Sequence, residues 1–204
     1  MNKNRIEELR VLAETQYLSL YDAKYINRGG KEKHWMIASR KKYDVLKSQY
    51  FHRKEEKIDA VIICALHKES NKLVLIKQYR IPLNDYVYEL PAGLVDADED
   101  MEKTLKRELK EETGLNFIEA IKCIGSEQVY VSSGMTDESV AFIYCLCEGT
   151  PSNEYLEEDE DIETILVSRE EAKSLLKSKV KMDIKALMAL ESFVRIGKEM
   201  FKEL

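Results

Sequence analysis

Apolar and polar positions form blocks that predict strands over much of the chain. Ile58 to Leu66 and Leu73 to Gln78 are apolar runs of strand length, and the polar segment 68–72 between them is typical of a hairpin. Tyr86 to Leu90 is a further strand candidate, because a proline and then a glycine break the pattern directly after it. These segments are expected to begin a central sheet.

Shorter strand-like pieces lie on both sides of this region. Tyr17 to Leu20 and Trp35 to Ser39 are separated by a pair of adjacent glycines, which is a turn signal. We therefore predict a small β-rich N-terminal segment over residues 1–56 and a main domain over residues 57–204. Further strands are expected over Phe117 to Tyr130, Ser139 to Cys147 and Ile162 to Val167.

The helix with the clearest signals lies in the middle of the chain. Acidic residues 98–100 offer an N-cap and first-turn acids, and Gly114 can end the helix in a left-handed conformation after Thr113. Two more helices are predicted, over Arg169 to Ser178 and Met182 to Leu204. Strands with helices around them indicate an α/β/α sandwich built on a mixed sheet.

Composition narrows the functional classes. The chain has 204 residues, 34% of them charged, and a formal net charge of −6. This balance argues against a nucleic-acid groove, which needs clustered Lys and Arg, and the longest apolar run is far below the ~20 residues of a membrane span. The cysteines, Cys64, Cys123, Cys145 and Cys147, include no CxxC pair. Buried thiols are expected rather than a zinc site, and we predict a cytoplasmic protein without membrane or nucleic-acid partners.

Three glutamates form an acidic ridge on the predicted central helix. Glu108, Glu111 and Glu112 share one helix face because they occupy positions i, i+3 and i+4. Leu105 and Leu109 lie at the edge of this ridge, so the glutamates are expected at the border of the core, where desolvation strengthens their repulsion. Carboxylates without Cys or His suit Mg²⁺ or Mn²⁺. The alternative is an acidic face that is merely solvated.

The residues around the ridge complete a longer pattern. Gly93, Glu99, Arg107 and Gly114 combine with the glutamates to give G-x5-E-x7-R-E-U-x-E-E-x-G-U, where U is aliphatic. This resembles the Nudix hydrolase motif at every fixed position. We expect Gly93 to allow a sharp turn after the strand and Arg107 to hold a ridge glutamate in a bidentate pair.

The resemblance implies hydrolysis of a nucleoside diphosphate linked to another moiety. It assigns Glu108, Glu111, Glu112 and the Ala92 carbonyl as ligands of two or three Mg²⁺ ions, with Mn²⁺ as a possible substitute. Glu111 is counted among the catalytic residues as well as the metal ligands. The substrate class is a small-molecule nucleoside diphosphate sugar.

Segments before the motif resemble the ADP-ribose pyrophosphatase branch of the family. Residues 78–80 (Gln-Tyr-Arg) and 89–93 (Glu-Leu-Pro-Ala-Gly) are similar to its Q-[FY]-R and E-x-P-A-G elements. By this resemblance Arg80 contacts a phosphate or the metal shell, and Glu89 contacts the substrate or supports that shell. Without a phosphate site nearby, Arg80 would be interpreted as a surface arginine.

The N-terminal segment also resembles that branch. Residues 35–40 are similar to its W-E-x-x-x-R strand, with Met36 in place of the acid. The resemblance implies that this segment is exchanged with a second subunit of a homodimer, and that Trp35 and Tyr17 stack on the adenine with Arg40 nearby. The alternative makes both rings core aromatics.

Two later loops complete the resemblance. Residues 132–138 are similar to the S-P-G-x-[ST]-[DE]-E loop and place Gly134 at the substrate, but Ser133 stands where proline is usual, which keeps other nucleoside diphosphate sugars open. The acidic run 157–161 resembles the loop that supplies a catalytic glutamate. We assign Glu160 and Glu158 as the general base and an outer metal contact, without an order between them. The alternative interpretation is that the acidic run 157–161 is simply a solvated loop.

The sequence thus predicts a Mg²⁺-dependent, homodimeric pyrophosphatase that converts ADP-ribose to AMP and ribose 5-phosphate. A first alternative is a pyrophosphatase for another sugar nucleotide, such as a UDP- or GDP-hexose. A second is a catalytically inactive sensor that binds ADP-ribose, against which the intact motif speaks.

Overall fold

The computed structural model describes residues 5–96, 98–121 and 128–202. The chain divides into two compact units. Unit 1 contains residues up to 59 together with 129–140, and unit 2 contains residues 60–128 and those from 141 onward. The segment 129–140 is far from the rest of unit 1 along the chain, so no local pattern in the sequence indicated its place.

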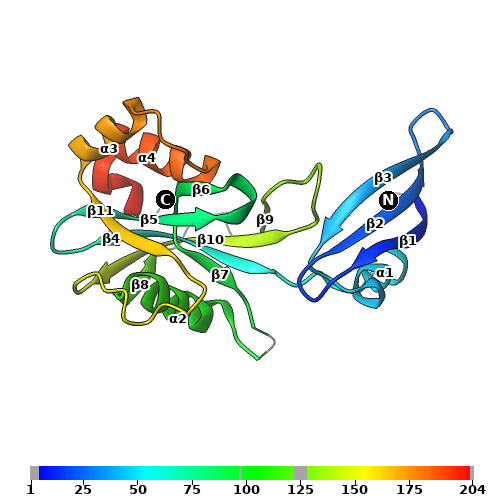
Figure 1. Ribbon diagram of the computed structural model, residues 1–204, viewed down its shortest axis with the longest axis horizontal. Helices are drawn as coiled ribbons and strands as arrows, with labels where there is room; N and C mark the ends of the chain where they lie inside the picture. Colours follow the sequence, from blue (N-terminus) through cyan, green and yellow to red (C-terminus); the bar gives the residue numbers. More distant parts are fainter. Residues whose placement is uncertain (1–4, 97, 122–127, 203–204) are drawn as a thin grey trace. The chain divides into compact units, whose positions relative to one another are not determined.

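Unit 1 is a three-stranded antiparallel sheet in the order β1-β2-β3, with one helix against it (Figure 1). The elements are β1 (Ile6–Glu14), β2 (Ser19–Ile26), β3 (Glu32–Ser39) and α1 (Tyr43–His52). Its core consists of Leu9, Tyr21, Ala23 and Leu46. The short β9 (Val129–Tyr130) pairs with the first two residues of β10 (Ser139–Glu148).

The predicted strand Trp35 to Ser39 is part of the longer β3, whereas only the last two residues of the predicted strand Tyr17 to Leu20 lie in β2, which begins at Ser19. Strand β1 and helix α1 were not predicted. Leu9 is the only buried residue of β1. The charged residues of this strand obscure the alternation of apolar and polar positions that would indicate a strand. Helix α1 has no side-chain N-cap and buries only Leu46, so it lacks both usual helix signals. Packing within unit 1 decides both elements.

Unit 2 is built on a sheet whose main strand order is β11-β5-β4-β10-β8. Strand β6 extends this sheet by pairing with β5, and β7 by pairing with β4. The strands are β4 (Ala60–His67), β5 (Lys72–Arg80), β6 (Asp85–Glu89), β7 (Ala92–Leu94), β8 (Asn116–Ile121) and β11 (Ile162–Val167). A 3₁₀ turn, η1 (Ile81–Leu83), connects β5 to β6. The predicted hairpin and the strands expected over Tyr86 to Leu90 and Ile162 to Val167 are confirmed, whereas β7 was not predicted.

Helices cover both faces of this sheet (Figure 1). Helix α2 (Met101–Thr113) contacts β4, β7 and β8, whereas α4 (Ile184–Ile196) contacts β5 and β6, and α3 (Arg169–Lys177) packs against α4. Every residue of β4 is buried as a result. The predicted α/β/α sandwich is confirmed.

One helix prediction is wrong in extent. The helix expected over Met182 to Leu204 ends at Ile196, where Gly197 adopts a positive φ of 58° and a 3₁₀ helix, η2 (Gly197–Phe201), follows. Residues 203–204 lie outside the described chain, as does the middle of the strand expected over Phe117 to Tyr130.

The described helices include none that is both long and apolar enough to cross a membrane. Cys64, Cys145 and Cys147 are buried thiols, as predicted, and burial raises the pKa of Cys147 to about 12. Cys123 lies outside the described residues. The thiols therefore pack as apolar groups of the core.

Candidate active site

Local sequence signals set the bounds of the helix that carries the acidic ridge. The Asp100 side chain accepts a hydrogen bond from the Lys103 N–H at 2.8 Å, which caps the first turn of α2. At the other end Gly114 has a φ of 72°, and a Cβ there would stand 2.6 Å from the Ser152 nitrogen. Glycine is therefore required at this helix end by both conformation and space.

The ridge glutamates lie where the amphipathic pattern placed them. Glu108 and Glu112 are buried, with 9% and 4% of their surface exposed, and Glu111 is half-buried. The alternative of a merely solvated acidic face is therefore wrong for Glu108 and Glu112. Arg107 Nη1 donates to Glu108 Oε1 at 2.8 Å and to Glu111 Oε2 at 2.9 Å. Arg107 holds two ridge glutamates through one nitrogen, where a bidentate pair with one was expected.

Gly93 lies against the ridge for a different reason from the one expected. It is the middle residue of β7, paired with Val61 of β4, and not part of a sharp turn. A Cβ on Gly93 would lie 1.7 Å from Glu108 Cδ. Glycine at this position therefore lets the Glu108 carboxyl group lie directly on the strand backbone.

Ala92 is held next to the ridge by its own backbone. Its N–H donates to Glu112 Oε2 at 2.9 Å, and β7 places it opposite Ile62. The structure thus brings Ala92, Glu108, Glu111 and Glu112 to one end of α2 and β7. These are the four residues that the sequence assigned to the metal.

Burial changes the protonation of the two buried glutamates. It raises the pKa of Glu108 to about 7, against the opposing effect of Arg107, and Glu111 and Glu160 add to the rise. Burial also raises the pKa of Glu112 well above its usual value, although the Ala92 N–H lowers it, and the charges of Glu108 and Glu160 raise it further. Burial therefore disfavours the charged form of both carboxyl groups, an effect that a bound cation would oppose.

The donor set suits a hard divalent cation, since it consists of carboxylates and a backbone carbonyl. Among the residues that the structure describes, no three Asp, Glu, His or Cys side chains converge closely enough to hold a metal ion. Arg107 binds Glu108 and Glu111, and the Ala92 N–H binds Glu112. A metal ion would therefore compete with these hydrogen bonds for the same carboxylate oxygens.

The acidic loop brings one of its two candidate bases to the ridge. Glu160 is half-buried, its charge acts on both Glu108 and Glu112, and its Oε2 accepts from the Glu157 N–H at 3.0 Å. Glu158 is exposed. The arrangement thus favours Glu160 over Glu158 as the group that faces the buried carboxylates.

Arg80 and Glu89 form a bidentate ion pair. Arg80 Nε and Nη2 each lie 2.8 Å from a different oxygen of Glu89, which is buried. The β5–β6 register places Arg80 opposite Asp85 and Glu89 opposite Ile76, so the ion pair joins residues of neighbouring strands that are not directly opposite each other. The hydrogen bonds that Arg80 donates to Glu89 raise the pKa of Arg80, and the charge of Glu112 contributes to that rise, so the ion pair lies near the ridge.

Glu99, a fixed position of the motif, holds Arg107 in place. Its side chain is 9% exposed and accepts hydrogen bonds from Arg107 Nε at 3.1 Å and Thr104 Oγ1 at 3.0 Å. Glu99 therefore fixes the arginine that in turn holds two ridge glutamates. Its fixed spacing of eight residues before Arg107 was the signal available in the sequence.

The remaining predicted site residues belong to unit 1. Trp35 Nε1 donates to the Gly134 carbonyl at 3.2 Å, and Arg40 Nε donates to Glu138 Oε1 at 2.8 Å. Trp35 is 52% exposed and Tyr17 is 72% exposed, so the alternative that both are core aromatics is wrong. The structure brings Trp35, Arg40 and the loop with Gly134 together, and Tyr17 lies in the turn between β1 and β2.

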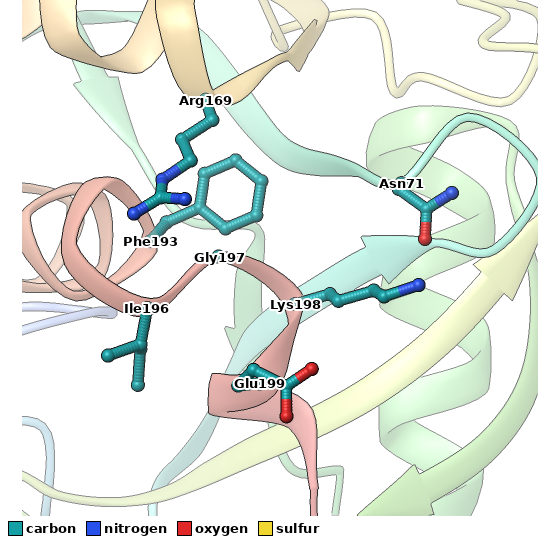
Figure 2. Close-up of a pocket in the computed structure, with 7 residues that line it drawn as sticks. All are labelled: Asn71, Arg169, Phe193, Ile196, Gly197, Lys198 and Glu199. Atoms are coloured by element: carbon teal, nitrogen blue, oxygen red, sulfur yellow. The ribbon is translucent and has the colours of Figure 1, made fainter.

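A pocket of about 350 Å³ opens elsewhere on unit 2, beside the end of α4 (Figure 2). Phe193, Lys198 and Asn71 are among the residues that line it. Its Arg169 donates hydrogen bonds to the carbonyls of Val194 and Arg195, so this guanidinium caps the helix. None of the predicted site residues lines this pocket.

Three comparisons relate the chain to known proteins. The family model described as the NUDIX domain matches residues 56–190. The ADP-ribose pyrophosphatase of Bacillus subtilis is 35% identical over 133 residues, 65% of this chain and 70% of that protein. The ADP-ribose pyrophosphatase of Saccharomyces cerevisiae is 33% identical over 117 residues, 54% of this chain and 46% of that protein.

A solved structure shows the same fold. The crystal structure of an ADP compounds hydrolase superposes with a TM-score of 0.71 and covers 98% of this chain and 96% of that chain, at 16% sequence identity. The match includes both units. The fold is therefore shared over nearly the whole length, with little sequence in common.

Proposed function

Since the chain belongs to the Nudix family, we propose that it is a Mg²⁺-dependent pyrophosphatase that hydrolyses ADP-ribose to AMP and ribose 5-phosphate. The observation that carries this proposal is the pair of buried glutamates, Glu108 and Glu112, on a ridge that Gly93 allows to approach the strand backbone. Two relatives named as ADP-ribose pyrophosphatases support the choice of substrate.

We assign the metal ligands to Glu108, Glu111, Glu112 and the Ala92 carbonyl. Two or three Mg²⁺ ions, or Mn²⁺ in their place, would supply positive charge to the pyrophosphate and lower the pKa of the attacking water. Of the three carboxylates, those of Glu108 and Glu112 are buried and that of Glu111 is half-buried. Before a metal ion binds, Arg107 holds Glu108 and Glu111 in their rotamers, and Glu99 in turn holds Arg107.

Two groups act on the reacting atoms. Glu160 accepts the proton of the attacking water, a role that contributes roughly 10²- to 10⁴-fold in rate where it is measured. Arg80 binds a phosphate oxygen, since Glu89 occupies its Nε and Nη2 and leaves Nη1 for the substrate. Glu89 thereby orients the guanidinium, while Glu158 is kept as an outer contact of the metal site.

Unit 1 supplies recognition of the adenosine part. Trp35 and Tyr17 present exposed aromatic faces on which adenine can stack, Gly134 lies beside Trp35, and Arg40 binds Glu138 of the same loop. The sheet of unit 1 also exposes apolar side chains on all three strands, among them Leu12, Leu20 and Met36. We assign this surface to a homodimer in which the N-terminal segment completes the partner's site.

A second candidate function is hydrolysis of a different nucleoside diphosphate sugar. Ser133 in place of proline favours it, because serine leaves the loop around Gly134 less constrained. We also assign the protein to the cytoplasm, which the buried thiols support. A substrate panel decides between the two functions: kcat/KM is expected to be highest for ADP-ribose, and a higher value for a UDP- or GDP-hexose would establish the alternative.

A further inference from the structure

The loop that carries Glu160 is fastened at its first end to helix α2. This loop, residues 149–161, connects β10 to β11. The Ser152 N–H donates to the Thr113 carbonyl at 3.1 Å, and the Lys110 ammonium lies 4.6 Å from the centre of the Tyr155 ring. These contacts hold the beginning of the loop next to the C-terminus of α2, several residues before Glu160.

Its second end is fastened directly after Glu160. The Asp161 carbonyl accepts from the Tyr79 N–H at 3.0 Å, and Ile162 then starts β11 opposite Gln78. The Asp161 side chain adds a separate contact, because the Tyr86 hydroxyl donates to its Oδ2 at 2.6 Å. A tyrosine of β6 thus holds the residue adjacent to Glu160.

The Tyr86 ring is itself fixed. It packs edge-on against Tyr79, with the ring centres 5.3 Å apart and the planes at 76°, and the Lys77 ammonium lies 4.9 Å from its centre. Both neighbouring side chains come from β5, which pairs with β6. The hydroxyl of Tyr86, an exposed residue whose ring contacts two side chains of β5, therefore extends from the sheet to the end of the loop.

Glu160 depends on the shape of this loop for its own position. Its carboxylate accepts from the Glu157 N–H and its N–H donates to the Glu157 carbonyl, so residues 157–160 form a closed turn. A turn fastened at Asp161 carries the carboxylate with it. A small displacement of that anchor moves the carboxylate relative to Glu108 and Glu112.

We propose that Tyr86 is a positioning residue for Glu160, acting through the hydrogen bond from its hydroxyl to Asp161. The inference rests on the proposed function, in which Glu160 is the general base. Tyr86 lies outside the family motif. In this proposal it touches neither the substrate nor the metal ligands. A positioning role of this kind affects the rate of the chemical step and leaves substrate binding unchanged.

The chain offers a closely matched control. The Tyr79 hydroxyl donates to Asn84 Oδ1 at 2.7 Å, so Tyr79→Phe removes a similar hydrogen bond from the same edge-to-face pair of rings and leaves the bond to Asp161 in place. Tyr86→Phe is expected to lower kcat for ADP-ribose by roughly 10-fold, with KM unchanged, whereas Tyr79→Phe leaves both parameters at the parent values. Asp161→Asn, which weakens the same bond from the other side, is expected to reproduce the Tyr86→Phe result.

Amide hydrogen exchange gives a readout independent of turnover. In Tyr86→Phe the Glu157 amide, which the loop turn protects, is expected to exchange faster than in the parent, and in Tyr79→Phe at the parent rate. Equal kcat values for the two phenylalanine variants, or a change confined to KM, would overturn the inference. Glu160→Gln, measured in parallel, separates the two claims: full activity in that variant refutes the base itself, whereas its inactivity together with equal phenylalanine variants refutes only the positioning role.

Discussion

The carboxyl group of Glu108 lies so close to Gly93 that a Cβ at position 93 would stand 1.7 Å from Glu108 Cδ. The contact joins strand β7 to helix α2 and holds one buried carboxylate at the edge of the sheet. It explains why the motif begins with a glycine, because any side chain there would displace the glutamate. The contact therefore belongs to the chemistry of the site as well as to its packing.

Gly93→Ala is expected to lower kcat/KM for ADP-ribose by about two orders of magnitude or more, because the new methyl group moves Glu108 out of the donor set. Gly29→Ala is the matched control, since a Cβ there meets only Asn27 Oδ1 at an ordinary 3.4 Å. Steady-state kinetics and thermal unfolding of both variants make the comparison. Parent activity in Gly93→Ala would show that the position of Glu108 does not matter.

Glu112→Gln is expected to reduce kcat by orders of magnitude while α2 stays folded. Glutamine can still accept the hydrogen bond from the Ala92 N–H, but it removes a negative charge from the metal site. Glu102→Gln, on the exposed first turn of the same helix, controls for loss of charge alone. Circular dichroism verifies the fold, and near-normal turnover of Glu112→Gln would mean that the metal ligands are misassigned.

Trp35→Ala is expected to raise KM for ADP-ribose more than it lowers kcat. Loss of aromatic stacking on a base is worth about 1 to 3 kcal/mol, which corresponds to roughly a 5- to 150-fold change in affinity. Trp35→Phe keeps a stacking face and is expected to retain most of the affinity. An unchanged KM with a lower melting temperature in Trp35→Ala would assign the residue to stability alone.

A buried ion group in unit 1 gives a prediction for pH. Lys41 Nζ lies 2.9 Å from both Asp59 Oδ2 and Asp137 Oδ2, and its side chain is 8% exposed. Burial alone would lower the pKa of Lys41, but the hydrogen bonds to the two aspartates outweigh it and the pKa is raised above 10.5. The stabilisation is therefore complete below pH 10.5 and is lost as the pH rises through the folded-state pKa.

Lys41→Met is expected to lower the free energy of unfolding at pH 7 by about 3 kcal/mol, because it leaves two carboxylates without their cation. The difference from the parent protein should shrink above pH 10.5. Urea unfolding followed by the fluorescence of Trp35, the single tryptophan of the chain, reports on unit 1 directly. A difference that stays constant up to pH 11 would refute the assignment.

The sequence predicted those parts of the site that depend on neighbours along the chain. The caps at Asp100 and Gly114 and the spacing of Glu108, Glu111 and Glu112 are local, and the structure has them as expected. The contact of Gly93 with Glu108 was not predictable in the same way, because it arises from the packing of a strand against a helix. A motif records that glycine is needed, but not which atom occupies the space.

Contacts between segments that are distant along the chain were also not predicted from the sequence. Arg80 and Glu89 were each identified, yet their ion pair joins residues that are not opposite each other in the β5–β6 register, so strand pairing alone does not predict it. Trp35 and Gly134 were assigned to one site, whereas their hydrogen bond depends on segment 129–140 joining unit 1. Helix α1 was missed because its burial comes from the sheet of unit 1 and leaves little amphipathic pattern.

The central claim is that the buried glutamates of α2 form a working site only with divalent cations. Its most direct test is the release of AMP from ADP-ribose by protein treated with a chelator, measured before and after addition of MgCl₂. We expect no detectable AMP from the metal-free protein and full recovery of turnover with Mg²⁺. Equal rates with and without the metal ion would contradict the account.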